Sequence, residues 1–217
     1  GSKYATKSEP QEEAMCALHH AMDEGNDGIV ILPCGSGKSA LIAEVMARAG
    51  TKCLVLCYEK QGVVQMATLL REHLNLVPNQ VCMLTGESKD EPNSLVCFVV
   101  MTYGLYAASV GATKKGRASA IGEFLKAQHW DCVACDEVHH ACAPTYRPFL
   151  EMLQRKARHM LGFTATLYRN DSVAEETRQE HERRLFGWIG PVLYRATAAE
   201  LERAGLIAKI RRAEVRV

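Results

Sequence analysis

The stretch LPCGSGKS, residues 32–39, decides the fold. It follows a short apolar run, residues 29–32, and precedes a segment of helical composition, residues 40–46. A glycine-rich loop between a strand and a helix lets backbone N–H groups approach phosphate oxygens. The loop therefore predicts a nucleotide-phosphate site, and its residues are Gly35, Ser36, Gly37, Lys38 and Ser39.

The polar side chains of this loop have separate predicted tasks. Lys38 is expected to reach the β- and γ-phosphates, and the Ser39 hydroxyl is expected to ligate Mg²⁺. Leu32 stands where the general G-x-x-x-x-G-K-[ST] pattern has its first glycine. We also expect Lys38 to face solvent while the site is empty. A glycine-rich turn that only caps a helix is the alternative.

Apolar runs recur along the chain and alternate with helix-like segments. These strand-like runs are residues 29–32, 53–57, 81–84, 96–101, 132–135 and 159–163. Runs that are apolar on both faces and separated by helices indicate a parallel sheet covered on both sides. The predicted fold class is α/β, with a mostly parallel central sheet flanked by helices in three layers.

The composition is that of an ordinary globular chain. Of the 217 residues, 47% are hydrophobic and 24% are charged, and the net charge is +1. Bulk charge therefore excludes general attraction to nucleic acid or to a membrane. The apolar runs are far shorter than the roughly 18 residues of a membrane span. The 9 cysteines, an odd number, lie mostly in strand-like runs and indicate a reducing compartment.

Three polar segments interrupt the strand-like pattern, at residues 85–94, 107–119 and 170–184. The last one has acidic residues first and basic residues last, which complements a helix dipole, but it has almost no apolar stripe. We predict a solvent-exposed helix or a mobile insertion there. A partner-binding element is the alternative.

Two acidic residues follow the apolar run 132–135, and they are Asp136 and Glu137. An aspartate at the tip of a strand in a phosphate-loop protein is placed to hold Mg²⁺. The adjacent glutamate can polarise an attacking water as a general base. This pairing indicates hydrolysis of a nucleoside triphosphate.

A zinc site is the alternative for the cysteines and histidines nearby, which are Cys132, Cys135, His139, His140 and Cys142. In a strand, residues three apart point to opposite faces, so the first two cysteines cannot reach one metal ion. We therefore predict no structural metal.

A third polar motif, Thr164-Ala165-Thr166, follows the run 159–163, and by itself it could only cap the next segment. In this order, however, the motifs resemble those of superfamily 2 helicases. The sequence resembles in particular the first RecA-like motor domain of the XPB family, the double-stranded DNA translocase of the factor TFIIH. The resemblance runs from about residue 11 to 217, and its most specific stretches are residues 30–39, 136–139, 161–167, 189–194 and 208–215.

The resemblance implies a RecA-like fold and an ATPase that uses ATP and Mg²⁺. It makes Lys38 and Glu137 catalytic, gives Mg²⁺ to Ser39 and Asp136, and places Gln11 near the adenine. Three further residues, which would couple the nucleotide state to DNA, are His139, Thr164 and Thr166. The candidates for DNA contact are Lys60, Thr102, Tyr103 and Arg169.

The same resemblance implies a nuclear protein and a set of partners. These are double-stranded DNA, a second RecA-like domain and TFIIH-type subunits, with no membrane among them. Pro10 stands before Gln11 where the family has tyrosine, and residues 169–171 read Arg-Asn-Asp in place of Arg-Glu-Asp. These departures indicate a divergent paralogue.

We expect residues 1–10 to be a tag remnant and lead-in, and residues 11–217 to form one ATP-binding domain. The chain ends where the family's second RecA-like domain would begin, so we expect half of a motor, weak or inactive alone. The alternative is a scaffold that binds nucleotide and recruits partners without hydrolysis. The presence of both Asp136 and Glu137 favours hydrolysis.

Overall fold

The computed structural model describes residues 9–88, 90–93, 95–111, 116–143, 146–167, 175–205 and 207. Its centre is a seven-stranded sheet in the order β3-β4-β2-β5-β6-β1-β7, with every neighbouring pair parallel. The strands are β1 (Gly28–Ile31), β2 (Cys53–Cys57), β3 (Val81–Leu84), β4 (Phe98–Thr102), β5 (Trp130–Asp136), β6 (Ala157–Thr164) and β7 (Val192–Arg195). The predicted parallel α/β class is confirmed. The strand-like runs correspond to β1 through β6, whereas β7 was not predicted.

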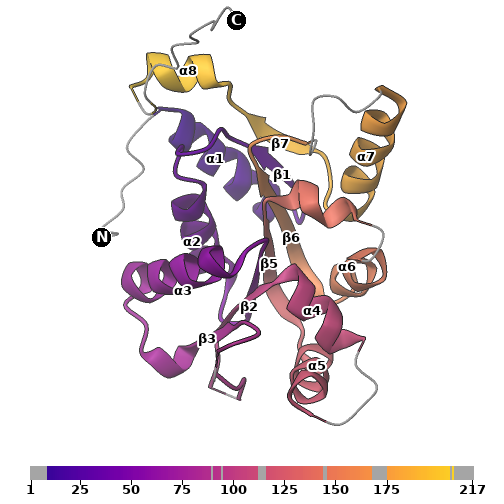
Figure 1. Cartoon of the computed structure of the whole chain (residues 1–217). Helices are drawn as coiled ribbons and strands as arrows, with labels where there is room; N and C mark the ends of the chain where they lie inside the picture. The colour runs from indigo at the N-terminus through magenta and orange to yellow at the C-terminus, as the bar shows by residue number, and fades with distance from the viewer. Residues whose placement is uncertain are drawn as a thin grey trace, which may run out of the picture.

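Helices cover both faces of the sheet. They are α1 (Glu9–Asp23), α2 (Lys38–Ala49), α3 (Lys60–Leu74), α4 (Tyr103–Val110), α5 (Arg117–Ala127), α6 (Arg147–Gln154), α7 (Glu175–Trp188) and α8 (Ala198–Arg203), with the 3-10 turns η1 (Pro78–Gln80) and η2 (Val138–Cys142). In Figure 1, α1, α2 and α3 lie on one side of the sheet, and α4 to α7 lie on the other. None of the described helices has the length and apolar content needed to cross a bilayer.

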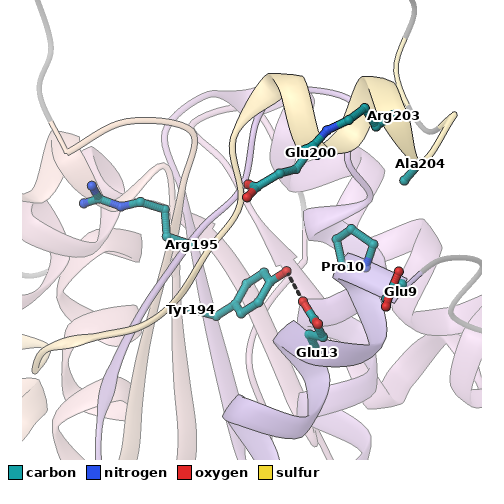
Figure 2. A pocket seen from close by; sticks show the side chains of 8 residues that line it. All are labelled: Glu9, Pro10, Glu13, Tyr194, Arg195, Glu200, Arg203 and Ala204. Atoms are coloured by element: carbon teal, nitrogen blue, oxygen red, sulfur yellow. Dashed lines mark hydrogen bonds between the residues drawn. The ribbon is translucent and has the colours of Figure 1, made fainter.

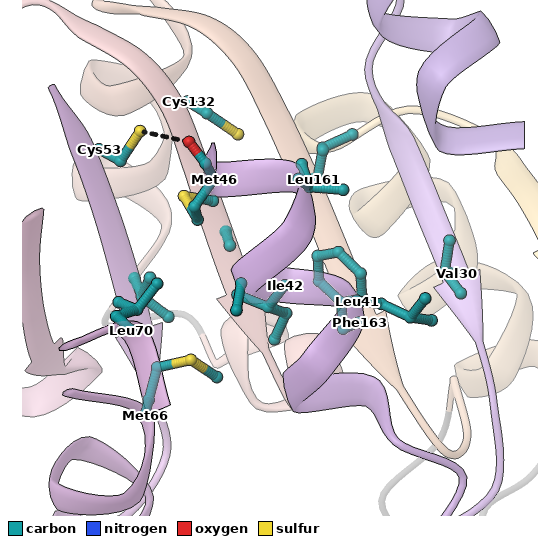
Figure 3. Packing of buried hydrophobic residues seen from close by; sticks show 14 of the residues in the cluster. Val30, Leu41, Ile42, Met46, Cys53, Met66, Leu70, Cys132, Leu161 and Phe163 are labelled. Atoms are coloured by element: carbon teal, nitrogen blue, oxygen red, sulfur yellow. Dashed lines mark hydrogen bonds between the residues drawn. The ribbon is translucent and has the colours of Figure 1, made fainter. Parts of the chain in front are cut away.

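Side-chain alternation along the strands divides the core into two clusters, one on each face. On β1, Val30 belongs to the cluster under α1, α2 and α3, whereas Ile29 and Ile31 belong to the other. Figure 3 shows the first cluster, which includes Leu41 of α2 and Phe163 of β6. Fully burying one such side chain stabilises the fold by roughly 1.5–3 kcal/mol.

The same alternation places the two cysteines of β5 apart. Cys132 lies in the first cluster and Cys135 in the second, as the strand period predicts. In the part of the chain that the structure describes, no group of three or more His, Cys, Asp or Glu residues could hold a metal ion.

Two of the polar segments contain helix. The segment 107–119 includes the end of α4 and the start of α5, so its described residues contain helix and no strand. Thr102 starts α4 by accepting a hydrogen bond from the N–H of Leu105, which is typical of a helix N-cap. From residue 175, the segment 170–184 is part of α7, in agreement with the predicted helix, and α7 buries Leu185 near its end.

Helices α4 and α5 pack closely where Gly122 of α5 meets the backbone of α4. A Cβ atom at Gly122 would lie 2.0 Å from the carbonyl oxygen of Ser109. Backbone atoms cannot move aside as a flexible side chain can, so any side chain at this position separates the two helices.

We therefore expect Gly122→Ala to lower the free energy of unfolding by about 1–3 kcal/mol, the range for overpacked sites. Gly104→Ala in α4 is the matched control, because a Cβ there meets nothing within 4 Å. That control should be neutral or slightly stabilising. Urea denaturation followed by circular dichroism measures both, and equal stability of the two variants would contradict the packing argument.

Candidate nucleotide-binding and catalytic site

Three neighbouring strands bring the predicted motifs to one edge of the sheet. Ile31 at the end of β1 lies opposite Thr164 at the end of β6, and Phe163 of β6 lies opposite Asp136 at the end of β5. The carboxyl ends of parallel strands meet at the same edge, which is where open α/β sheets bind ligands. The structure thus brings together the glycine-rich loop, the acidic pair and the Thr164 motif.

The loop after β1 has the backbone shape of an anion cradle. Gly35 and Gly37 have φ values of 77° and 87°, in the left-handed region that favours glycine. A Cβ at Gly37 would lie 2.4 Å from Nε2 of Gln11. That same Nε2 donates a hydrogen bond to the carbonyl oxygen of Ser36 at 2.7 Å. The structure therefore places Gln11 against the loop, where it fixes the loop's shape.

The residues present fit a phosphate group and Mg²⁺. The Ser36 side chain is only 2% exposed, and its Oγ has no hydrogen-bond partner within the described residues. A buried hydroxyl without a partner is costly, so a phosphate oxygen would satisfy it. Ser39 lies exposed in the first turn of α2. Its hydroxyl and the Asp136 carboxylate are the oxygen ligands that Mg²⁺ prefers.

Lys38 is buried, with 9% of its surface exposed, so the expectation that it faces solvent is wrong. Its Nζ donates to the carbonyl oxygen of Leu32 at 3.2 Å and to that of Pro33 at 3.5 Å. It also lies 3.7 Å from Oε1 of Glu137. The physical reason is charge compensation, because an ammonium group under the loop needs acceptors. Lys38 is thus held beside the predicted phosphate position.

The acidic pair lies at the tip of β5. Burial, followed by repulsion from Glu137, raises the pKa of Asp136 to about 6, and the charge of Lys38 opposes this shift. Glu137 has a φ of 47°, a left-handed conformation that is rare outside glycine. Its N–H donates to Oδ1 of Asp136 at 3.1 Å.

The three predicted coupling residues form one hydrogen-bonded cluster with Glu137. Nδ1 of His139 lies 2.8 Å from Oγ1 of Thr164 and 3.5 Å from Oε2 of Glu137. The Thr164 hydroxyl, fully buried, donates to the Thr166 carbonyl oxygen at 2.6 Å and lies 3.4 Å from Oε2 of Glu137. The position of the Glu137 carboxylate is therefore tied to β6 and η2.

The four candidates for DNA contact are placed differently. Lys60, at the start of α3, is exposed and forms an ion pair with Glu87. Tyr103 is 2% exposed and donates its hydroxyl to the Asp136 carbonyl oxygen at 3.0 Å, which is at odds with direct contact to DNA. Thr102 caps α4. Arg169 lies outside the described residues. The Tyr103 bond to β5 was missed, because Tyr103 and Asp136 are far apart in the sequence and β2 lies between β4 and β5 in the sheet.

A cavity of about 460 Å³ lies directly beside the glycine-rich loop. Pro33 and Cys34 of the loop, Thr166 and residues 195–198 are among its lining. Arg195 and Glu182 also line this cavity, so its wall carries one positive and one negative charge. Its position beside the glycine-rich loop, and not its charge, makes this side of the loop suitable for an anionic ligand.

A second cavity of about 440 Å³ lies between α1, β7 and α8. Figure 2 shows Glu9, Glu13, Glu200, Arg195 and Arg203 among its lining, with the Tyr194 hydroxyl donating to Glu13 at 2.8 Å. Burial and the adjacent Glu13 raise the pKa of Tyr194. The three carboxylates outnumber the two guanidinium groups, so a polyphosphate is disfavoured here relative to the glycine-rich loop.

Comparison with known proteins identifies related sequences. Residues 6–169 match the family model of the type III restriction enzyme, res subunit. The TFIIH helicase/translocase subunit XPB of Danio rerio is 31% identical over 95% of this chain and 25% of its own length, and that of Drosophila melanogaster is 29% identical over 98% and 25%. The chain spans about a quarter of the length of the curated relatives it matches.

Solved structures share the fold. The helicase domain of Pyrococcus furiosus Hef superposes with a TM-score of 0.66 at 20% identity, covering 89% of this chain and 39% of the other. The Sulfolobus solfataricus SWI2/SNF2 ATPase core, solved in complex with double-stranded DNA, has a TM-score of 0.65 at 13% identity, covering 87% and 36%. At these identities the likeness concerns the fold alone.

The raised pKa of Asp136 gives a pH-dependent stability with a defined sign. The folded-state pKa of Asp136, about 6, lies above 3.8, the ordinary pKa of an aspartate side chain. The folded state therefore binds the proton more tightly than the unfolded state does. The resulting stabilisation is complete below the unfolded pKa and is lost as pH rises through the folded one. We expect the stability of the wild type relative to Asp136→Asn to fall between pH 4 and 7.

Urea denaturation at several pH values measures this difference, and Asp23→Asn serves as the control. The hydrogen-bonded ion pair with Arg48 lowers the pKa of Asp23, so Asp23 is ionised in both states above about pH 5 and its stability difference should stay flat from there to pH 7. A flat curve for Asp136→Asn as well would contradict the buried, proton-binding carboxyl.

Proposed function

Because the chain belongs to the family of the type III restriction enzyme res subunit, we propose that it is the ATP-binding half of an XPB-like DNA helicase or translocase. The resemblance to XPB subunits is confirmed by identities of 28–31% over nearly the whole chain. Residues 11–217 would form the first of two RecA-like domains. The observation that carries the proposal is the meeting of Lys38, Glu137 and the unpaired Ser36 hydroxyl around one glycine-rich loop.

Binding of the triphosphate would rest on the loop and on α2. Backbone N–H groups at Gly35 and Gly37 and the helix N-terminus favour anionic oxygens. Lys38 would exchange its two carbonyl acceptors for phosphate oxygens, which are stronger, charged acceptors. The buried Ser36 hydroxyl would gain the partner it lacks among the described residues.

Ser39 and Asp136 would hold Mg²⁺. The chemistry that the ion would supply there is neutralisation of the negative charge that develops on the phosphate oxygens. With a pKa of about 6, Asp136 is mostly ionised at pH 7 and is ready to act as a ligand. Below pH 6 protonation would compete with the metal.

Glu137 would accept the proton of the attacking water. Its Oε1 lies 3.7 Å from Lys38 and its Oε2 is held by Thr164 and His139. Once Lys38 turns to phosphate, Oε1 is released and becomes the basic oxygen. The anchored Oε2 keeps the carboxylate oriented, as a general base requires. This geometry favours hydrolysis over a scaffold that only binds nucleotide.

The second half of the motor would supply further cations. Within the described residues, Lys38 is the cation paired with the candidate base. In related hydrolases an arginine finger contributes about 10³–10⁵ in rate. We therefore assign that group to a second RecA-like domain. DNA would be contacted through Lys60, Thr102 and Arg169, with Tyr103 acting through Asp136.

The cellular role is proposed from the relatives. The XPB proteins that the chain resembles carry the name of general transcription and DNA repair factor IIH subunits. We propose the same setting for this chain, with a nuclear location, TFIIH-type partners and double-stranded DNA as substrate. Transcription initiation and nucleotide excision repair are the corresponding processes.

The Lys38→Ala variant tests nucleotide binding. Loss of a charged hydrogen bond to phosphate is worth about 1.5–3 kcal/mol, or roughly a ten- to hundred-fold weaker Kd. Isothermal titration with ATP and Mg²⁺ measures the Kd. Lys60→Ala is the control, because Lys60 is exposed and forms its ion pair with Glu87, away from the glycine-rich loop. Because Lys38 is buried, the unfolding midpoint is measured alongside. Equal affinity of Lys38→Ala and wild type would contradict the assignment.

The half-motor proposal predicts very low ATPase activity for this chain alone, with little stimulation by duplex DNA. A longer chain that includes the second RecA-like domain should show DNA-stimulated turnover. In that chain, Glu137→Gln should abolish turnover and keep ATP binding, because the amide preserves the shape but accepts no proton. Steady-state phosphate release measures the turnover of each chain. Turnover by the 217-residue chain at the rate of the longer chain would overturn the proposal.

A further inference from the structure

The ring of Tyr58 lies flat on the ring of His140. Tyr58 is the first residue after β2, and His140 lies in η2, directly after the acidic pair. The ring centroids are 3.4 Å apart and the planes differ by 5°. Tyr58 is 42% exposed, so its position is set by this contact more than by burial in the core.

The stack continues to the candidate base. The ring of His140 lies 4.1 Å, centroid to centroid, from that of His139. His139 in turn lies 2.8 Å from the Thr164 hydroxyl and 3.5 Å from the Glu137 carboxylate. Contacts at van der Waals and hydrogen-bond distance therefore run without a gap from Tyr58 to Glu137.

At its other end the stack meets the candidate DNA-contact loop. Tyr58 precedes Glu59, the N-cap residue of α3, and Lys60 follows as the first residue of that helix. A cavity of about 420 Å³ lies between this loop and the acids, with Tyr58 and Gln61 lining one side and Asp136 and Glu137 the other. The ring stack thus bridges two groups that face each other across open space.

Nucleotide binding would disturb the catalytic end of the series. A bound phosphate would replace Glu137 as the ion-pair partner of Lys38. Glu137 also has a left-handed φ of 47° and lies immediately before η2. A non-glycine residue in that conformation stores backbone strain, and such residues cluster at active sites and in switch regions. Any change of its backbone moves η2, which carries both histidines.

We propose that Tyr58 and His140 are positioning residues that couple the ATP site to residues 58–61, where α3 begins. This inference rests on the proposed ATP-binding function. Neither side chain touches the reacting atoms. The stack makes the start of α3 follow η2, so the Lys60 side chain is presented differently with and without nucleotide.

The test is nucleotide-induced chemical-shift change in the 217-residue chain, recorded with the non-hydrolysable analogue AMPPNP and Mg²⁺. In the wild type, backbone amides of the glycine-rich loop and of residues 60–63 should both shift. Tyr58→Ala and His140→Ala should keep the loop shifts and lose those at residues 60–63. Tyr58→Phe, which keeps the ring, should restore them.

Phe186→Ala is the matched control, because it removes another aromatic ring of similar exposure, 38%, from α7. It should leave both sets of shifts unchanged. Persistence of the shifts at residues 60–63 in both alanine variants would overturn the coupling. Absence of shifts at the glycine-rich loop in the wild type would instead refute the nucleotide site, so the two failures are distinguishable.

Discussion

All the chemistry of this domain depends on β5, β6 and β1 being parallel neighbours in fixed register. Each strand ends at the same edge of the sheet, with Ile31 level with Thr164 and Phe163 level with Asp136. Each strand is buried on both faces, so a shift of one residue would place the wrong side chains in both cores. The apolar packing under α2 therefore fixes the distance between the loop and the acids.

Charged side chains gather at that edge, and the positive charge of Lys38 lies beside the negative charges of Asp136 and Glu137. Lys38 lies among two carbonyl oxygens and Glu137, while burial raises the pKa of Asp136 to about 6. A phosphate group would replace weak acceptors of Lys38 and free Glu137 at the same time. Binding of one phosphate group would thus pair the charge of Lys38 and at the same time free the Glu137 carboxylate to act as a base.

Features with a local signal in the sequence were predicted correctly, whereas contacts between remote residues were not. Apolar runs bounded by turns predicted the strands β1 to β6, and the motif at residues 32–39 predicted the glycine-rich loop between β1 and α2. The burial of Lys38 and the bond from Tyr103 to Asp136 depend on how loops fold over the finished sheet. Strand β7 was missed because only its pairing with β1 distinguishes it from loop. No spacing in the sequence encodes these contacts.

The contact of Tyr58 with His140 follows from the same sheet constraint. Leu56 of β2 lies opposite Cys135 of β5, so the segments after these strands leave the edge side by side. The segment proposed to contact DNA and the segment that carries the proposed base therefore follow neighbouring strands. Rings placed there transmit a change over a short path, without any rearrangement of the core. The close-packed strands beneath have low compressibility, so a movement of η2 is expected to displace the exposed ring of Tyr58 more than it displaces the core.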